Sequence, residues 1–425
     1  MIKFIFASIL VLGLVACNNE EPKSISENNT IESHISDNSE LKGVWSGKIS
    51  GSPLEMIITL SEQSGALSVP AQNITSLQAE SISYHNDSFT MNINFEGQNI
   101  EISGALKEGV IEGLFSQNGV EAPITFAPHK EDVVENETYE RINIDAEGGT
   151  LIAALELPPK TPSAVAIIVA GSGGTDKNGN SLGMESNSYK MLAESLAAEG
   201  IATIRYDKRG IGENQGLVKD LNQITIDLFA NDVENIVKYA LQDERFSDVH
   251  IIGHSEGALL ATLVAQKQKV DSIILLAGVG RSMDEVLIEQ LSAQLPANLL
   301  EESRNILTSL KAGKIVESVS KELQPVFSIP NQRYLISLIK YNPVDELDKV
   351  STKKYVVQGN TDIQVSETDW VGLSKVATEA IMIEGMNHIL KESPAERTAN
   401  IATYNEPNLS LHKDIAPTIE RIISN

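Results

Sequence analysis

Hydrophobic and polar residues alternate along the N-terminal part of the chain, between residues 41 and about 130. Phe89, Met91, Ile93 and Phe95 occupy every second position, with polar residues between them. This spacing predicts half-buried strands, and glycine and Asn-Asp turns separate the short runs. We expect a small antiparallel sheet, closed or curled around its apolar face. Further strands are predicted at residues 54–60, 100–105 and 111–115.

Farther along the chain, short continuous apolar runs replace the alternation. Such runs predict strands at residues 166–169, 249–252, 272–277, 355–357 and 380–383. Residues 281–345 instead show helical spacing, with breaks expected at four positions. The leucine and isoleucine positions that carry this spacing are Leu287, Leu291, Leu295, Leu299, Ile306 and Leu310, and the breaks are at Pro296, Gly313, Pro325 and Pro330.

The N-terminus has the pattern of a targeting segment, with Lys3 before an apolar run at residues 4–15. This run is too short to span a bilayer, so residues 1–16 are interpreted as a signal peptide. Cys17, the only cysteine, follows Val15-Ala16 and resembles the lipobox cysteine of bacterial lipoproteins. The resemblance implies a lipid anchor at Cys17 and a location in the bacterial cell envelope, on its periplasmic or cell-surface face. A conventional cleaved signal with an incidental cysteine is the alternative.

Residues 17–40 are rich in Asn, Ser and Glu and poor in apolar residues. A segment of this composition cannot bury a core, so it predicts a flexible tether. The expected order of the chain is therefore a signal peptide, a tether, a β-rich domain at residues 41–130 and a larger C-terminal domain at residues 139–425.

The pentapeptide Gly253-His254-Ser255-Glu256-Gly257 follows a predicted strand and opens a small-residue helix. A serine between two glycines in a strand-turn-helix context is typical of a nucleophile elbow, where the hydroxyl stands exposed above a sheet. By itself the pattern also fits a surface serine in a glycine-rich loop. The hypothesis of a nucleophilic Ser255 therefore depends on its partners.

A base for Ser255 is expected downstream, because this architecture orders its triad as serine, acid and histidine. His388 follows the predicted strand at residues 380–383, whereas His412 lies in a polar stretch with no preceding strand. His388 is the predicted base. Asp362, in the loop after the strand at residues 355–357, is the predicted acid, and Asp284 is the more distant alternative.

An oxyanion hole requires two backbone donors near Ser255. The N–H of Glu256, at the start of the helix, is the first candidate. The second is the N–H of Ser172, in the glycine-rich loop Gly171-Ser172-Gly173-Gly174 that follows a predicted strand. Such a loop can also cradle a phosphate, but no Walker lysine or G-x-G-x-x-G pattern accompanies it.

Five segments occur in a characteristic order: Gly171–Asp176, Arg205–Gly212, Gly253–Gly257, Gly359–Asp362 and Asn387–His388. Together they resemble the α/β-hydrolase superfamily, and within it the serine-aminopeptidase-like carboxylesterase branch. The resemblance covers about residues 139–425. It implies a mostly parallel sheet flanked by helices, with a helical lid at about residues 281–345 that lines an acyl pocket or forms an ordinary extra layer.

Two positions depart from the pattern of many relatives: Ala170-Gly171 stands where His-Gly is common, and Met386-Asn387 precedes the base. Neither departure removes a predicted catalytic group. Asp207 and Arg209 belong to a matching motif, and we interpret them as an ion pair or a loop anchor. Trp45, in Gly43-Val44-Trp45-Ser46-Gly47, resembles the opening strand of a lipocalin-like barrel and is expected in its core.

The chain has 425 residues, of which 41% are hydrophobic, and a net charge of −25. This acidity opposes binding to nucleic acid or to anionic membrane surfaces. No metal cluster and no cofactor motif is evident, so neither is expected.

The sequence predicts a serine hydrolase that cleaves small-molecule acyl esters. A peptidase or amidase, with Glu256 as a candidate for binding a free amino group, and a noncatalytic surface-binding lipoprotein are the alternatives.

Overall fold

The computed structural model describes residues 38–49, 55–69, 74–95, 98–117, 120–129, 139–181, 184–292 and 294–424. The predicted signal peptide, Cys17 and the tether up to residue 37 lie outside the described residues. Residues 38–40, which were predicted to belong to the tether, begin the short 3-10 helix Asn38–Leu41. The described residues form two compact units, which divide between residues 136 and 137.

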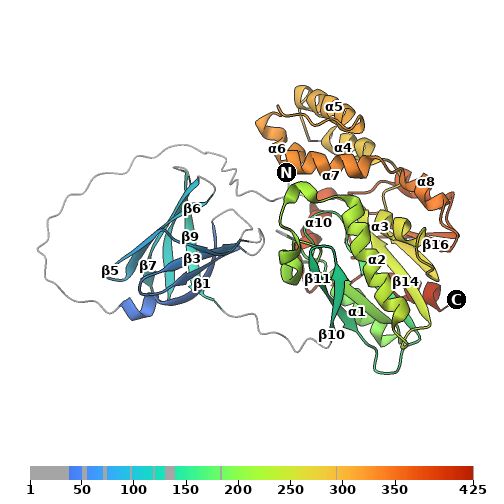
Figure 1. The fold of residues 1–425 in the computed structure, drawn as a ribbon, viewed down its shortest axis with the longest axis horizontal. Helices are drawn as coiled ribbons and strands as arrows, with labels where there is room; N and C mark the ends of the chain where they lie inside the picture. Colours follow the sequence, from blue (N-terminus) through green and yellow to red (C-terminus); the bar gives the residue numbers. More distant parts are fainter. Residues whose placement is uncertain are drawn as a thin grey trace, which may run out of the picture. The chain divides into compact units, whose positions relative to one another are not determined.

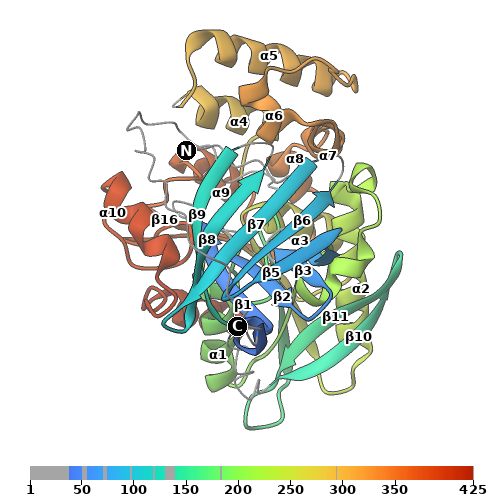
Figure 2. The ribbon, with the colours of Figure 1, turned by 90° about the vertical axis from the view of Figure 1, so that its left-hand side faces the viewer.

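The first unit is a nine-stranded sheet in which every pair of neighbours is antiparallel. Its spatial order is β4-β3-β2-β1-β9-β8-β7-β6-β5, and Figure 2 shows β7, β8 and β9 running side by side. The strands are β1 (Gly43–Ile49), β2 (Glu55–Leu60), β3 (Gly65–Val69), β4 (Ile74–Gln78), β5 (Ser81–His85), β6 (Ser88–Phe95), β7 (Gln98–Lys107), β8 (Val110–Gln117) and β9 (Val120–Pro128).

This sheet curls, so that β5 approaches the region of β3. The Tyr84 hydroxyl donates to the carbonyl oxygen of Ser61, at 2.5 Å, and a Cβ added to Gly65 would touch the side chains of Ile82 and Met91. Alternate residues fill the interior: Phe89, Met91 and Ile93 are all at most 2% exposed, as the alternation predicted. Trp45 is also in this core, with Nε1 donating to the carbonyl oxygen of Leu41 at 2.9 Å.

The second unit is built on an eight-stranded sheet of order β10-β11-β13-β12-β14-β15-β16-β17. The pairs β10–β11 and β11–β13 are antiparallel, and the five pairs from β13 to β17 are parallel. The strands are β10 (Glu140–Ala146), β11 (Gly149–Glu156), β12 (Ala164–Val169), β13 (Ala202–Tyr206), β14 (Asp248–His254), β15 (Ser272–Leu276), β16 (Lys353–Gly359) and β17 (Glu379–Ile383).

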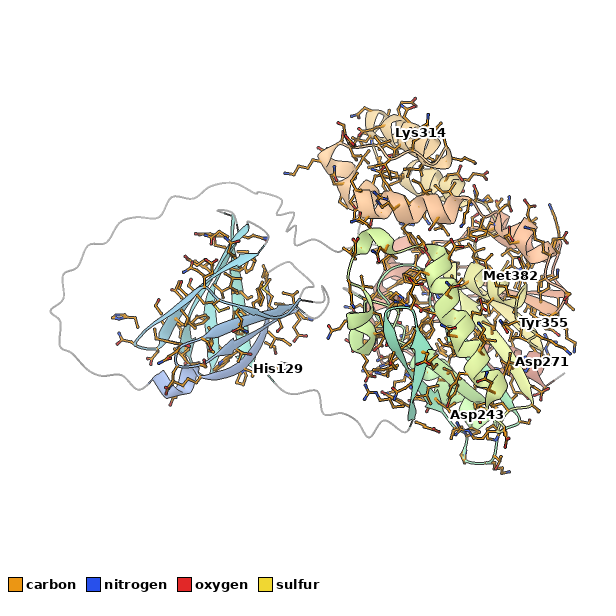
Figure 3. The ribbon with its side chains drawn as sticks, in the orientation of Figure 1. His129, Asp243, Asp271, Lys314, Tyr355 and Met382 are labelled. Carbon is orange, nitrogen blue, oxygen red and sulfur yellow. The ribbon has the colours of Figure 1, made fainter. Side chains whose placement is uncertain are left out.

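Helices cover both faces of this sheet (Figure 1). On one face α2 (Ile226–Gln242) and α3 (Glu256–Ala265) pack on the odd-numbered side chains of β12, and on the other α1 (Ser188–Ala198) and α11 (Ile415–Ile423) pack on the even-numbered ones. Side chains fill the space between the sheet and its helices (Figure 3). Because the central strands are buried on both sides, their sequences are continuous apolar runs. Two short helices, α9 (Glu367–Ser374) and α10 (Arg397–Ala402), complete the unit.

Five helices lie between β15 and β16, and the first four of them share an apolar core of their own, whereas the fifth packs on the main core. They are α4 (Met283–Ser292), α5 (Ala297–Lys311), α6 (Gln324–Phe327), α7 (Ile329–Ile339) and α8 (Pro343–Asp348). Pro296 and Gly313 bound α5 as the spacing predicted. Pro325 and Pro330, predicted as breaks, instead lie in the first turns of α6 and α7, where a missing N–H costs nothing. None of the helices that the structure describes is both long and apolar enough to cross a membrane.

Candidate active site

Ser255 lies in a sharp turn between β14 and α3. Its φ of 54° and ψ of −118° place a residue with a side chain in a strained backbone region, and its N–H donates to the Leu276 carbonyl oxygen at 2.8 Å. A Cβ at Gly253 would overlap the carbonyl oxygen of Gly257, and a Cβ at Gly257 would overlap that of Val169. Backbone crowding therefore requires glycine at both positions that flank the serine turn.

His388 and Asp362 form a hydrogen-bonded pair in the loops that follow β17 and β16. Nδ1 of His388 lies 2.8 Å from Oδ2 of Asp362, and both side chains are buried. Burial by itself would raise the Asp362 pKa, but the imidazole and the N–H groups of Gln364 and Val365 outweigh burial and hold that pKa below its usual value. An ionised carboxylate can only accept, so Nδ1 carries a hydrogen; in the neutral form of the ring Nε2 is the acceptor.

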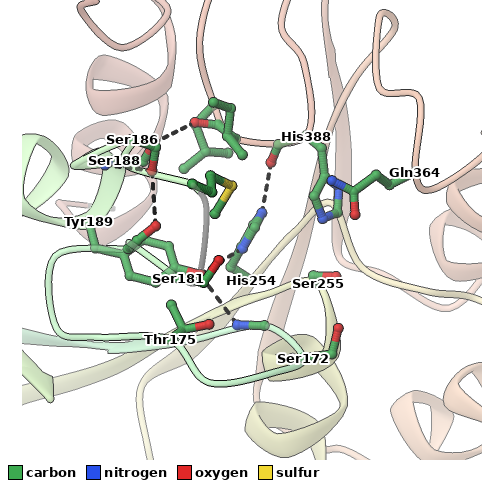
Figure 4. A pocket seen from close by; sticks show the side chains of 15 residues that line it. Ser172, Thr175, Ser181, Ser186, Ser188, Tyr189, His254, Ser255, Gln364 and His388 are labelled. Atoms are coloured by element: carbon green, nitrogen blue, oxygen red, sulfur yellow. Dashed lines mark hydrogen bonds between the residues drawn. The ribbon is translucent and has the colours of Figure 1, made fainter. Parts of the chain in front are cut away.

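Ser255 and His388 line one small pocket, together with Ser172 (Figure 4). Its cavity volume is about 70 Å³. No carboxylate lines this pocket among the described residues, and its polar surface is mostly hydroxyl groups. The other lining residues are Gly171, Thr175, Gly179, Ser181, Met184, Ser186, Ser188, Tyr189, His254, Gln364, Ile389 and Leu390.

The side chain of His254, the residue before Ser255, connects three segments that line this pocket. Its Nε2 lies 2.8 Å from the carbonyl oxygen of His388, and its Nδ1 lies 2.8 Å from the Tyr189 hydroxyl, which accepts from the Gly171 N–H at 3.3 Å. Burial, with a smaller contribution from the nearby His388, lowers the His254 pKa to about 3. The ring is therefore neutral, with Nε2 donating to the carbonyl oxygen and Nδ1 accepting from the tyrosine.

Glu256 is not among the residues that line the pocket, and its carboxylate is bound to a buried lysine. Lys208 Nζ lies 3.0 Å from Glu256 Oε1, and each side chain is at most 3% exposed. The same ammonium group donates to the carbonyl oxygen of Gly171 at 2.8 Å. This arrangement is inconsistent with the expectation that the Glu256 side chain binds a substrate amino group, because a lysine already occupies it.

Asp207 and Arg209 are loop anchors and do not pair with each other. Arg209 forms a two-pronged ion pair with Asp232 of α2, with nitrogen–oxygen distances of 2.8 and 2.5 Å. Asp207 accepts from the backbone N–H groups of Lys177 and Glu213. Both residues therefore support the loops around the site without lining the pocket.

The alternative base and acid, His412 and Asp284, form their contacts outside the pocket of Ser255. His412 Nδ1 is 3.8 Å from Asp414, and Asp284 pairs with Lys311 in the helical insertion. None of these residues lines the pocket of Ser255. Within the described residues, no group of three or more His, Cys, Asp or Glu side chains could hold a metal ion.

Sequence reasoning gave no role to the side chains of Tyr189, His254, Lys208 or Gln364. Lys208 lies inside the motif Arg205–Gly212, so its position in the motif could have indicated proximity to the site. For Tyr189 and Gln364 the sequence carries no comparable signal, because their contacts depend on how α1 and the loop after Asp362 pack in three dimensions.

Comparison with known proteins finds a matching family model and a curated relative. The family model described as serine aminopeptidase S33 matches residues 180–363, a range that includes Ser255 and Asp362. The curated esterase EstD of Thermotoga maritima is 26% identical over 309 residues, covering 68% of this chain and 70% of the relative.

Solved structures resemble this chain at low identity. Est1E from Butyrivibrio proteoclasticus is 17% identical, with a TM-score of 0.43, and covers 67% of this chain and 99% of its own. Proline iminopeptidase from Mycobacterium smegmatis is 17% identical, with a TM-score of 0.43, and covers 67% of this chain and 98% of its own.

The mostly parallel sheet, the helices on both of its faces and the turn at Ser255 have the arrangement of an α/β-hydrolase fold. The matched family model and the curated relative further show that the chain is an enzyme, a serine hydrolase, as the sequence predicted.

Proposed function

We propose that this protein hydrolyses carboxylic esters with short acyl groups, with Ser255 as the nucleophile. The observation that carries the proposal is the His388–Asp362 pair at 2.8 Å, together with the position of His388 and Ser255 on one pocket. The curated relative is named an esterase, which supports the choice of an ester over other acyl substrates.

In this mechanism Ser255 Oγ attacks the ester carbonyl carbon while His388 Nε2 takes its proton. His388 then gives the proton to the leaving alcohol, and water repeats the sequence to release the acid from the acyl-enzyme. Asp362 holds the ring in the required tautomer and stabilises the imidazolium that forms in each half-reaction. Its lowered pKa supports this role, because the carboxylate remains charged throughout the reaction.

The oxyanion of each tetrahedral intermediate would be bound by the N–H groups of Glu256 and Ser172. Among the described residues, neither group donates to a protein acceptor. Glu256 also begins α3, so its N–H lies at the positive end of a helix dipole. Both features support these two donors, because an unpaired N–H at a reaction site is free to bind developing negative charge.

The volume of the pocket indicates how large an acyl group it can hold. A dry cavity of about 150 Å³ accommodates benzene, so a cavity of about 70 Å³ has room for roughly three carbon atoms. We therefore expect acetyl and propionyl esters to be preferred. Amide cleavage at a free amino terminus, the activity in the family model's description, is disfavoured because no carboxylate lines the pocket of the described structure.

The test begins with a fluorophosphonate, which labels an activated serine, followed by intact-mass measurement. We expect one label on the wild-type protein and none on Ser255→Ala. With p-nitrophenyl esters, Asp362→Asn should lower kcat by about 10⁴-fold, and octanoate should be hydrolysed at least about ten times more slowly than acetate. A wild-type protein that takes no label, or that keeps its activity in Ser255→Ala, would contradict the proposal and favour a binding role.

As to its location, we propose that this enzyme is tethered to a bacterial envelope membrane by lipid attached to Cys17. The resemblance of residues 14–17 to a lipobox supports the tether, because multiple acyl chains anchor a protein stably. Mass spectrometry of the mature N-terminus should find a diacylglyceryl group that is absent from Cys17→Ser. An unlipidated mature Cys17 would favour the conventional signal peptide.

A further inference from the structure

Lys208 is a buried cation that makes two hydrogen bonds to residues of the candidate active site. The residue is 2% exposed. Its Nζ donates to the Gly171 carbonyl oxygen at 2.8 Å and to Glu256 Oε1 at 3.0 Å, and it lies 4.4 Å from the centre of the Phe229 ring. An ammonium group has three donors; two of them are used in these hydrogen bonds, and the Phe229 ring adds a cation–π contact.

The contact with Gly171 controls the orientation of a neighbouring group. The carbonyl oxygen of Gly171 and the N–H of Ser172 belong to one planar peptide unit, in which they point in opposite directions. Holding the oxygen against Lys208 therefore fixes the direction of the Ser172 N–H. A hydrogen bond to the carbonyl oxygen also polarises the peptide unit and strengthens its N–H as a donor.

The second contact connects the lysine to the other proposed donor. Glu256 supplies a backbone N–H at the start of α3, and its side chain holds the ammonium of Lys208. One ion pair thus connects the peptide unit of Ser172, on the loop after β12, to the residue that follows the nucleophile. These segments lie 84 positions apart in the sequence, from residue 172 to residue 256.

A contribution to the free energy of unfolding does not by itself explain why the buried ion pair of Lys208 and Glu256 is present. Replacing a buried ion pair by uncharged side chains of similar volume is often neutral or stabilising, because both ions lose their hydration. A role in orienting the two donors is a stronger explanation, since it depends on the charge and position of Lys208.

We propose that Lys208 and Glu256 are positioning residues that set the spacing and donor strength of the oxyanion hole. This inference rests on the proposed function and deepens it. Because an oxyanion exists only in the tetrahedral intermediate and the transition states around it, the pair should affect kcat and leave substrate binding nearly unchanged.

The decisive variant is the double substitution Lys208→Met with Glu256→Gln, which removes both charges and keeps side-chain length. Lys208→Met alone should lower the Tm strongly, since it leaves a buried carboxylate unpaired, and the double variant should recover most of that loss. We expect kcat for p-nitrophenyl acetate to remain about 30- to 100-fold below wild type in the double variant. KM should change by less than about threefold, the pattern of an interaction that is made only in the transition state.

A trifluoromethyl ketone provides a second readout, because Ser255 adds to its carbonyl group and forms an oxyanion reversibly. Its inhibition constant should rise in the double variant by about the factor that kcat/KM falls. Arg209→Met with Asp232→Asn is the matched control, since this pair is equally buried, Arg209 lies on the same loop as Lys208, and neither residue lines the pocket. That control should change kcat and the inhibition constant by less than about threefold.

The outcomes separate the two proposals. Wild-type activity in a folded Lys208→Met/Glu256→Gln protein, or equal loss in the Arg209 control, would overturn the positioning role and leave the esterase intact. Absence of fluorophosphonate labelling in the wild-type protein would overturn the esterase proposal and this inference with it.

Discussion

The backbone conformation at Ser255 determines which residue types fit at the positions on either side of the serine turn. The backbone turns so tightly at this serine that both flanking positions lie against carbonyl oxygens, those of Gly257 and Val169. A methyl group fits at neither position, which is why the motif could be interpreted from sequence as a turn with an exposed serine. The strain at φ 54° is maintained by the strand before the turn and the helix after it.

Gly257→Ala tests this crowding. The new Cβ would overlap the backbone at Val169, which cannot shift without moving the central strand β12, so we expect a loss of at least about 2 kcal/mol in the free energy of unfolding. Gly216→Ala is the control, since no atom lies within 4 Å of its Cβ, and it should change stability by at most about 0.5 kcal/mol. Urea titration measures both, and equal stabilities would refute the role of crowding at Gly257.

His254 should also make the fold sensitive to acid. Its folded-state pKa of about 3 lies below the unfolded value of about 6.5, so below pH 6.5 the unfolded chain takes up a proton that the folded chain refuses. Stability is therefore complete above pH 6.5 and falls as the pH drops toward 3. At pH 4.5 the loss from this one residue amounts to about 2–3 kcal/mol.

His254→Gln removes the titrating group and keeps a polar side chain. We expect the variant to be less stable than wild type at pH 7.5, because the bonds to Tyr189 and to the His388 carbonyl oxygen are altered. Its stability should however fall by about 2–3 kcal/mol less than that of wild type between pH 7.5 and 4.5. Parallel pH profiles in urea unfolding would show that His254 does not titrate as the buried environment requires.

At the scale of secondary-structure elements, the sequence predicted strands and helices best where burial is uniform. The runs at residues 166–169 and 249–252 fall within β12 and β14, because strands buried on both faces tolerate only apolar residues. The spacing from Leu287 to Leu310 likewise falls on α4 and α5. Both patterns are local, so they can be recognised without knowledge of the tertiary structure.

Elements that meet only in three dimensions could not be predicted in the same way. Tyr189 on α1 reaches His254 across 65 positions of sequence, and Lys208 reaches Glu256 across 48. The sequence offered Glu256 only as a candidate amine-binding residue within the peptidase alternative. Only the position of Lys208, in the loop after β13, shows that the carboxylate is already paired.

At the scale of the whole molecule, the two units bury separate sets of apolar residues. Three apolar clusters of the second unit are drawn entirely from residues 142–423, while Trp45 and its neighbours fill the curled sheet. A hydrophobic core gives cooperative unfolding to the residues that share it. Because the chain divides into two compact units whose buried apolar residues are not shared, we predict two unfolding transitions.

The two tryptophans of the chain make that prediction measurable, because Trp45 lies in β1 of the first unit and Trp370 in α9 of the second. In Trp45→Phe, fluorescence reports the hydrolase unit alone, and in Trp370→Phe it reports the curled sheet. We expect different urea midpoints in the two variants. A trifluoromethyl ketone at 100 times its inhibition constant should stabilise the Trp370 transition by about 2.7 kcal/mol and leave the Trp45 transition unchanged. If the inhibitor moved both transitions together, the units would unfold as one, and the curled sheet would have to be treated as part of the catalytic structure.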